Sequence, residues 1–247
     1  MNTKVFWLSL IVIFISFVGG FLLANAFNRT ELNDLRAENE RLKNSQEDKN
    51  SVNSQIALSD EEIRRKIAEA DQNPNNFAFQ KSLGIALYRY ATMKQDTELL
   101  AEVARLLNRA VENNPKDYDV IVTLGNIYFD IGYFKKENDK LQKAREFYQK
   151  VLEQKPKDAD VRTDFGLTYF LETPPETEKA IVEFQKSLKE NPKHEKTLQV
   201  LTEALLSQNK TEDAEKYLAK LKEVNQNNPS VSHLTTQLSQ AENNGQK

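Results

Sequence analysis

Five prolines recur at nearly regular intervals over most of this chain, and they limit what it can fold into. Pro74, Pro115, Pro156, Pro192 and Pro229 are separated by 41, 41, 36 and 37 residues. A recurring interval of this length is typical of a repeat array, in which each unit stacks on the next. Because proline cannot continue a helix, each proline is expected to end one unit and begin the turn into the next.

A common pattern follows each of the first four prolines. Ten residues on, the chain has Leu83-Gly84, Leu124-Gly125, Phe165-Gly166 and Leu201-Thr202. Glycine costs up to about 1 kcal/mol inside a helix, so its recurrence indicates that a neighbouring helix approaches closely there. A second helix in each unit has small or apolar residues at fixed offsets: Val103, Leu107, Ala110; Ala144, Tyr148, Val151; Ala180, Phe184, Ser187; and Ala214, Tyr217, Leu218, Leu221. Two antiparallel helices per unit predict an all-α solenoid of helical hairpins.

This pattern resembles the tetratricopeptide repeat (TPR) family, whose signature joins Leu-Gly and Tyr on a first helix to Ala and Phe on a second, and then Pro. The best match is Phe165-Gly166, Tyr169, Ala180, Phe184 and Pro192. The resemblance implies a right-handed TPR-like solenoid of about four repeats, at 74–114, 115–155, 156–191 and 192–229. The first two units exceed the family period of about 34 residues. We therefore expect longer hairpin tips or helix extensions around Ala91–Thr97 and Ile131–Asp139.

Short helices are expected to cap both ends of the array. Ser59 and Glu62 form a capping box ahead of a helix with apolar positions through Ala70. Val231, Leu234 and Leu238 have helical spacing after the last proline. The solenoid with its caps is thus predicted to span 58–241, with a disordered tail at 242–247.

The amino-terminal region has the features of a membrane anchor. No charged residue occurs from Val5 to Phe27, which exceeds the ~20 residues needed to cross a bilayer. Residues 1–28 are therefore predicted to form a single transmembrane helix. Lys4 and the Ala24-Asn25-Ala26 pattern leave open a signal peptide cleaved after Ala26. Large trailing domains can be translocated regardless of charge, and we favour an extracytoplasmic, periplasmic location for the repeats.

A short coiled-coil stalk and a polar linker are predicted at 29–57. The heptad core positions are Leu32, Leu35, Asn39 and Leu42. A buried Asn at an a position favours two parallel strands, which predicts a parallel homodimer. A solvated, monomeric helix is the alternative, because two heptads alone are marginal in water.

The TPR resemblance also implies where a client would bind, since the first helix of each hairpin faces the concave side. Tyr88, Phe129 and Phe170 would form one aromatic stripe, although each ring could instead pack between repeats. The stripe predicts a groove for an extended or helical peptide, with apolar anchors and some basic character. The implied peptide-binding residues are Lys81, Ile85, Tyr88, Arg89, Asp119, Val122, Asn126, Phe129, Asp130, Asp160, Thr163, Leu167 and Phe170.

One known TPR binding mode is disfavoured by the sequence. Chaperone-binding members of the family hold an acidic carboxyl-terminal tail with a set of basic residues. Lys81 matches the first position of that set, but Ile85 stands where Asn is expected. Thr163 and Asp164 replace later basic residues, so capture of an acidic tail in this manner is not expected.

Composition and motifs argue against other classes of protein. A formal charge of -3 and a pI near 5.7 disfavour a nucleic-acid partner. The absence of cysteine excludes disulfides and Cys-ligated zinc. His194 and His233 are isolated in the sequence and are expected to be exposed, so no metal site, cofactor or catalytic residue is predicted. The chain is not expected to be an enzyme.

The expected function is that of a membrane-tethered scaffold or adaptor that binds a protein or peptide client in its groove. One narrower alternative comes from layout, because an anchored chain with a leader helix before Asp71–Asn76 resembles the TPR domains of c-type cytochrome maturation factors, which hold the apoprotein. Cleavage of the first segment would instead indicate a secreted structural repeat protein.

Overall fold

The computed structural model describes residues 59–245, which form ten α-helices and no strand. The helices are α4 (Asp60–Gln72), α5 (Phe77–Lys94), α6 (Thr97–Asn113), α7 (Tyr118–Lys135), α8 (Asn138–Gln154), α9 (Ala159–Phe170), α10 (Thr177–Glu190), α11 (Glu195–Ser207), α12 (Thr211–Val224) and α13 (Ser230–Gly245). None of these helices is both long and apolar enough to cross a bilayer. The predicted anchor, cleavage site, stalk and linker lie outside the described residues.

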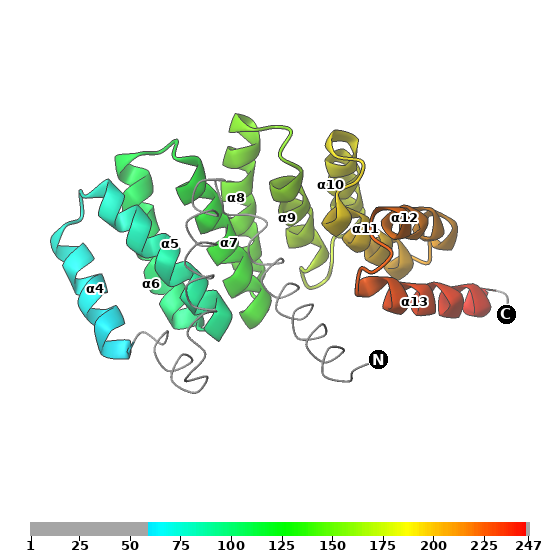
Figure 1. The fold of residues 1–247 in the computed structure, drawn as a ribbon, viewed down its shortest axis with the longest axis horizontal. Helices are drawn as coiled ribbons and strands as arrows, with labels where there is room; N and C mark the ends of the chain where they lie inside the picture. Colours follow the sequence, from blue (N-terminus) through cyan, green and yellow to red (C-terminus); the bar gives the residue numbers. More distant parts are fainter. Residues whose placement is uncertain (1–58, 246–247) are drawn as a thin grey trace, which may run out of the picture. The chain divides into compact units, whose positions relative to one another are not determined.

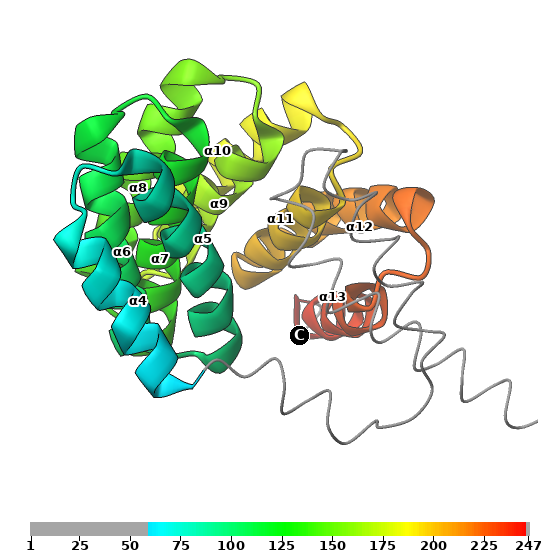
Figure 2. The same ribbon diagram turned by 60° about the vertical axis from the view of Figure 1, so that its left-hand side comes forward.

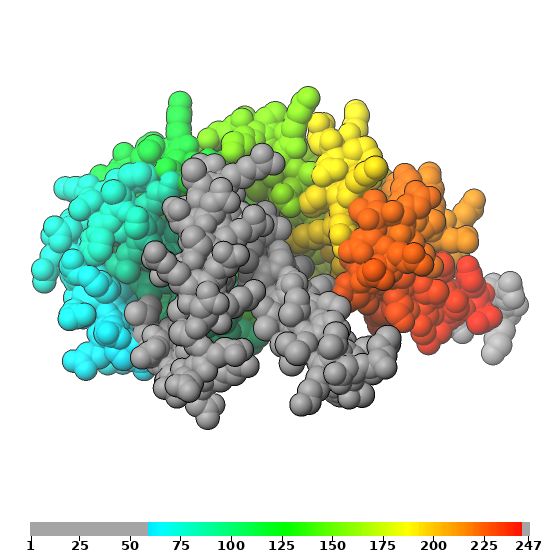
Figure 3. Space-filling view, in the orientation of Figure 1, coloured from blue at the N-terminus to red at the C-terminus, as the bar shows by residue number. Residues whose placement is uncertain are grey.

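The helices from α5 to α12 form four hairpins that pack side by side in chain order (Figure 1), and the visible colours of the space-filling view follow the same order (Figure 3). In each hairpin the first helix lies toward the inside of the curve and the second toward the outside (Figure 2). We call the surface of α5, α7, α9 and α11 the inner face, and that of α6, α8, α10 and α12 the outer face. The helix α13 packs on α12 and α11 and closes the carboxyl end of the array. The all-helical repeat solenoid predicted from the sequence is confirmed.

Pro115, Pro156 and Pro192 lie in the tight turns between hairpins, whereas Pro74 lies between α4 and the first hairpin and Pro229 between the fourth hairpin and α13. Two residues after each of the first three prolines in chain order is a side chain that caps the next helix, and these side chains are Asn76, Asp117 and Asp158. They accept hydrogen bonds from the backbone N–H groups of Phe79, Val120 and Val161 at 3.1, 3.0 and 3.0 Å. Such caps are worth about 1 kcal/mol each. One short segment thus ends a hairpin and starts the next.

The recurring glycines lie where the two helices of a hairpin cross, as predicted. A Cβ atom added at Gly84 would lie 2.4 Å from Leu107, and one at Gly125 would lie 2.6 Å from the Tyr148 ring. At Gly166 it would lie 2.6 Å from the Phe184 ring. The facing residues Leu107, Tyr148 and Phe184 are almost fully buried. Thr202 occupies the same place in the fourth hairpin and has no exposed surface.

The extra residues of the first two repeats lengthen helices. The inner helices α5 and α7 have 18 residues each, against 12 in α9 and 13 in α11. The outer helices α6 and α8 have 17 residues, against 14 in α10 and α12. Only Gln95 and Asp96 connect α5 to α6. Of the two predicted alternatives, helix extension is therefore confirmed and longer hairpin tips are wrong.

The predicted capping box before α4 is present, because Ser59 and Glu62 each accept a hydrogen bond from the other's backbone N–H, at 3.2 and 2.9 Å. At the other end, α13 continues to Gly245, so the prediction of a disordered tail is wrong for residues 242–245. No proline or glycine occurs between Ser230 and Asn244 to end this helix earlier.

Candidate functional site

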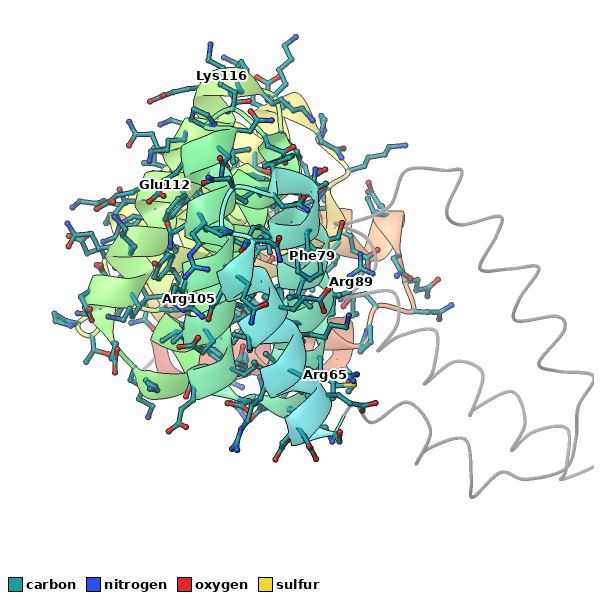
Figure 4. All side chains as sticks on the ribbon, turned by 90° about the vertical axis from the view of Figure 1, so that its left-hand side faces the viewer. Arg65, Phe79, Arg89, Arg105, Glu112 and Lys116 are labelled. Atoms are coloured by element: carbon teal, nitrogen blue, oxygen red, sulfur yellow. The ribbon has the colours of Figure 1, made fainter. Side chains whose placement is uncertain are left out.

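The predicted groove residues all lie on the inner helices α5, α7 and α9. Figure 4 shows the separation of the two faces in the first hairpin, where Phe79 and Arg89 of α5 lie on the opposite side from Arg105 and Glu112 of α6. Among the predicted residues, Arg89 and Asp119 are exposed, and Val122 and Thr163 are buried. The half-buried ones are Lys81, Ile85, Tyr88, Asn126, Phe129, Asp130, Asp160, Leu167 and Phe170.

Two rows of side chains run along the inner face at matching positions of successive hairpins. The first, which we call the aromatic row, consists of Tyr88, Phe129 and Phe170. The second row consists of Ile85, Asn126, Leu167 and Glu203. Every member of both rows is half-buried. Their packing holds the side chains in place, and the surface that remains is open to a partner.

Two predicted groove residues have buried side chains. Val122 is 8% exposed and Thr163 is fully buried. The Thr163 hydroxyl lies 3.0 Å from the Ser187 hydroxyl of its own hairpin and 2.5 Å from the Thr197 hydroxyl of α11. These contacts hold Thr163 between the third and fourth hairpins, so its prediction as a groove-lining residue is wrong.

The basic residue Lys81 is already paired. Its Nζ atom lies 3.0 Å from Asp117 Oδ1 and 2.8 Å from Asp119 Oδ2, which joins α5 to the start of α7. Burial lowers the pKa of Lys81, but hydrogen bonds to Asp119 and Asp117 outweigh it, so the net pKa is raised. The single positive charge of Lys81 is therefore neutralised by two carboxylates of the same chain.

Asp130 is a carboxylate held by neutral donors. The Tyr88 hydroxyl and the Thr92 hydroxyl, both on α5, donate to Asp130 Oδ2 at 3.1 and 2.8 Å. No Lys, Arg or His within the described chain lies within ion-pair distance of it. Burial raises the pKa of Asp130 to about 6, and the charge of Asp164 adds to this effect.

Asp164 is the second carboxylate at the middle of the inner face. It is 7% exposed, and Lys196 Nζ on α11 donates to its Oδ1 at 2.5 Å. Near it, the Tyr148 hydroxyl donates to Asn126 Oδ1 at 2.9 Å. Burial raises the pKa of the Tyr148 phenol, and Asp164, Tyr88 and Asp130 raise it further. These groups therefore act on one another across α5, α7 and α9.

His194 differs from its prediction as an exposed residue. Its side chain is 14% exposed, Nε2 lies 2.8 Å from Asp160 Oδ1, and Nδ1 lies 2.5 Å from the Thr197 hydroxyl. The hydrogen bond with His194 lowers the pKa of Asp160. Thr197 is fully buried, so this Asp–His–Thr line has no hydroxyl that a substrate could reach. His233 is exposed as predicted.

Comparison with protein-family models gives two matches, both described as tetratricopeptide repeat, at residues 125–158 and 176–238. These two stretches, which make up less than half of the chain, match tetratricopeptide repeats. The matched stretches include parts of the second and third hairpins and the whole of the fourth, with the inner helix α11 and the outer helices α8, α10 and α12 complete. No curated protein matches the chain.

Solved TPR structures resemble the chain at low sequence identity. MamA (41-end) from Desulfovibrio magneticus RS-1 is 19% identical, with a TM-score of 0.55, and the match covers 69% of this chain and 87% of MamA. YrrB, described as a TPR protein with an unusual peptide-binding site, is 14% identical with a TM-score of 0.54, covering 80% and 97%. A TPR protein from Parabacteroides merdae is 23% identical with a TM-score of 0.51, covering 64% and 61%. These likenesses establish the fold alone.

Proposed function

We propose that this TPR chain is a membrane-tethered scaffold that holds a protein or peptide client against its inner face and performs no catalysis itself. The observation that carries the proposal is the aromatic row. Tyr88, Phe129 and Phe170 occupy matching positions of three successive hairpins and are all half-buried. Aromatic side chains that are held in place and still accessible are typical anchors of protein interfaces.

The fold supports this proposal because each hairpin repeats the same inner surface, so a client segment can contact several hairpins at once. YrrB, a protein of similar fold, is described as having a peptide-binding site. For the tether, the support is the uncharged Val5–Phe27 stretch of the sequence. The proposal places the repeats on the extracytoplasmic side of the membrane. The alternatives of a cytochrome maturation factor and of a secreted structural protein stay predictions.

Affinity capture of the full-length protein in mild detergent tests the proposal. The variant Phe129→Ala, Phe170→Ala removes two rings of the aromatic row, and Val182→Ala, on the exposed surface of α10, is the control. We expect a client that the wild type and the control retain and that the double variant loses by at least about tenfold, as for truncated interface anchors. Far-UV circular dichroism checks that the double variant is folded. A partner list that is the same for all three proteins would contradict the proposal.

The tether and the stalk are tested separately. A retained anchor keeps the protein in the membrane pellet after a carbonate wash, whereas cleavage after Ala26 releases a soluble product. Replacing Asn39 by Lys should abolish crosslinking into dimers, because a charge at the core position opposes pairing of two helices. Crosslinking that is unchanged in this variant would rule out the coiled-coil stalk.

A further inference from the structure

We propose that the client segment carries a lysine or arginine flanked by apolar residues, and that this cation pairs with Asp130 while the apolar residues pack on the aromatic row. The inference rests on the proposed function and names the chemistry of the client. It concerns the middle of the inner face, where α5, α7 and α9 lie next to one another.

The first argument is how the carboxylates of the inner face are paired. Lys81 lies between Asp117 and Asp119, and Lys196 pairs with Asp164. Asp160 contacts His194, which carries a charge only when it is protonated. Asp130 on α7 and Glu203 on α11 are half-buried carboxylates for which no ion pair is found in the described part of the chain. At these two positions the inner face favours a cationic group of a client over an anionic one.

The second argument is the environment of Asp130. Its two hydrogen bonds come from the neutral hydroxyls of Tyr88 and Thr92, so its negative charge is not balanced when the carboxyl is ionised. A hydrogen bond from a charged donor is roughly twice as strong as one from a neutral donor. A client guanidinium or ammonium group would thus gain more here than at a carboxylate that already has a cation.

The third argument is that the carboxylate lies beside the aromatic row. Asp130 accepts a hydrogen bond from the Tyr88 hydroxyl, so its carboxylate contacts one member of that row. A cation beside an aromatic ring is further stabilised by the electrons of the ring face. The apolar neighbours of the cation in the client would reach the other rings of the same row. An anionic residue at that place would be repelled by Asp130.

The test uses the full-length protein in mild detergent and three synthetic nine-residue peptides that carry a neutral fluorescent dye. Each peptide has leucine two positions before and two positions after its centre, and the central residue is arginine, norleucine or glutamate. Binding is measured by fluorescence anisotropy at pH 7.5 and low salt. We expect the arginine peptide to bind at least about tenfold more tightly than the norleucine peptide, and the glutamate peptide to bind most weakly.

A single variant assigns this preference to Asp130. Asp130→Asn should bind the arginine peptide no more tightly than the norleucine peptide. The matched control is Asp213→Asn, which removes an exposed carboxylate from the first turn of α12 and should keep the preference. A folded Asp130→Asn protein that keeps the preference would overturn the inference.

A pH titration of the wild type gives the same test without any substitution. Protonation of Asp130 between pH 7.5 and pH 5 should weaken binding of the arginine peptide several-fold and leave the norleucine peptide unchanged. The groups that face Asp130 are Tyr88 and Thr92 from α5, Asp164 from α9 and, at longer range, Lys196 from α11. An arginine affinity that does not change over this range would overturn the inference.

The outcomes distinguish the inference from the proposed function. Peptides that bind without charge preference, and that are lost on Phe129→Ala, Phe170→Ala, would overturn the inference and support the proposed function. If no peptide binds and the ring variant changes nothing in affinity capture, both fail.

Discussion

The first two hairpins and the last two follow one plan at different sizes. In α5–α6 and α7–α8, helices of 18 and 17 residues are joined by two-residue connections. In α9–α10 and α11–α12 the helices have 12 to 14 residues. The close crossing of the two helices is nevertheless kept throughout, with glycine in three hairpins and Thr202 in the fourth. Successive hairpins therefore share the position of the helix crossing, although their helices differ in length.

The junctions between hairpins differ in chemistry as well. On the inner face, Asp130 accepts hydrogen bonds from two hydroxyls of α5, whereas Asp160 contacts His194 at the start of α11. Between the third and fourth hairpins, the buried hydroxyls of Thr163, Ser187 and Thr197 hydrogen bond to one another. A buried polar cluster is stable only when its members are satisfied in this way. The same fold thus uses an unbalanced charge at one junction and a closed polar network at the other.

The glycine crossings give the largest expected effect. We expect Gly125→Ala to lower the free energy of unfolding by about 1–2 kcal/mol. Overpacking costs about 1–3 kcal/mol, and the better helix propensity of alanine returns up to about 1 kcal/mol. The new Cβ would meet the rigid Tyr148 ring at 2.6 Å, and that ring is fixed by its hydrogen bond to Asn126. Urea titration of the full-length protein in mild detergent, followed by circular dichroism, measures the change.

The glycine of the first hairpin, Gly84, gives a comparison for Gly125→Ala. Gly84→Ala should cost less than Gly125→Ala, because its Cβ would meet Leu107 Cδ2 and Cγ at 2.4 and 2.7 Å, and a leucine side chain can change its rotamer more readily than the hydrogen-bonded Tyr148 ring. Ser82→Ala, at an exposed position of α5, is the control and should change the free energy by less than about 0.5 kcal/mol. Equal losses for the two glycine variants would mean that the rigidity of the facing side chain does not decide the cost.

The two carboxylates give opposite dependences on pH. The pKa of Asp130 is raised from 3.8 to about 6, so its contribution to stability is full below 3.8 and is lost as the pH rises through 6. That difference corresponds to about 3 kcal/mol at most over the whole range, and about half of it falls between pH 5 and pH 7.5, because the unfolded chain is already ionised at pH 5. After discounting for partial exposure, wild type should therefore lose about 0.5–1 kcal/mol relative to Asp130→Asn between pH 5 and pH 7.5, as measured by urea titration at each pH.

Asp160 is the comparison. Its pKa is lowered, so its contribution is present above 3.8 and is lost only as the pH falls below that value. The difference in stability between wild type and Asp160→Asn should therefore shrink as the solution is made more acidic than pH 3.8, which is opposite in direction to the change for Asp130. If the two variants show the same pH profile, the two junctions do not differ in the way described.

Much of the fold could be predicted from the sequence because it depends on local spacing. The prolines, the glycines and the small residues that face them recur at one phase, and each recurrence reports the same hairpin. The capping residues Asn76, Asp117 and Asp158 were visible too, two positions after their prolines, and a search of the turns for side-chain acceptors would have found them.

Contacts between hairpins were harder to predict. Asp160 and His194 are 34 residues apart, Asp164 and Lys196 are 32, and Tyr88 and Asp130 are 42. Each separation is close to one repeat, so the period indicates which residues lie in neighbouring hairpins. Which of these side chains meet depends on how far one hairpin is rotated on the next, and local spacing does not fix that rotation. For the same reason Thr163 was expected in the groove, although it lies between hairpins.

The smallest expected effect concerns Thr202, where the fourth hairpin departs from the other three. Thr202→Ala loses a buried methyl group, worth about 0.8 kcal/mol, and a hydroxyl that bonds to the Leu198 carbonyl of its own helix at 2.8 Å. Alanine is the better helix former by about 0.5 kcal/mol, and the lost bond to the preceding turn contributes little. The net change in the free energy of unfolding should therefore stay within about 0.5 kcal/mol, by the same urea titration.

Thr202→Gly places the residue of the other three hairpins in the fourth, and it completes the argument. If Thr202 already fills the space at this helix crossing, no large facing ring is needed there. Glycine at this position would then lose the methyl contacts and would also disfavour the helix. We expect this variant to be less stable than Thr202→Ala by about 1 kcal/mol. A gain in stability would mean that the fourth crossing has the same shape as the others and only tolerates threonine. A loss would mean that the facing helix is placed to suit the larger side chain, so that each crossing is matched to its own pair of residues.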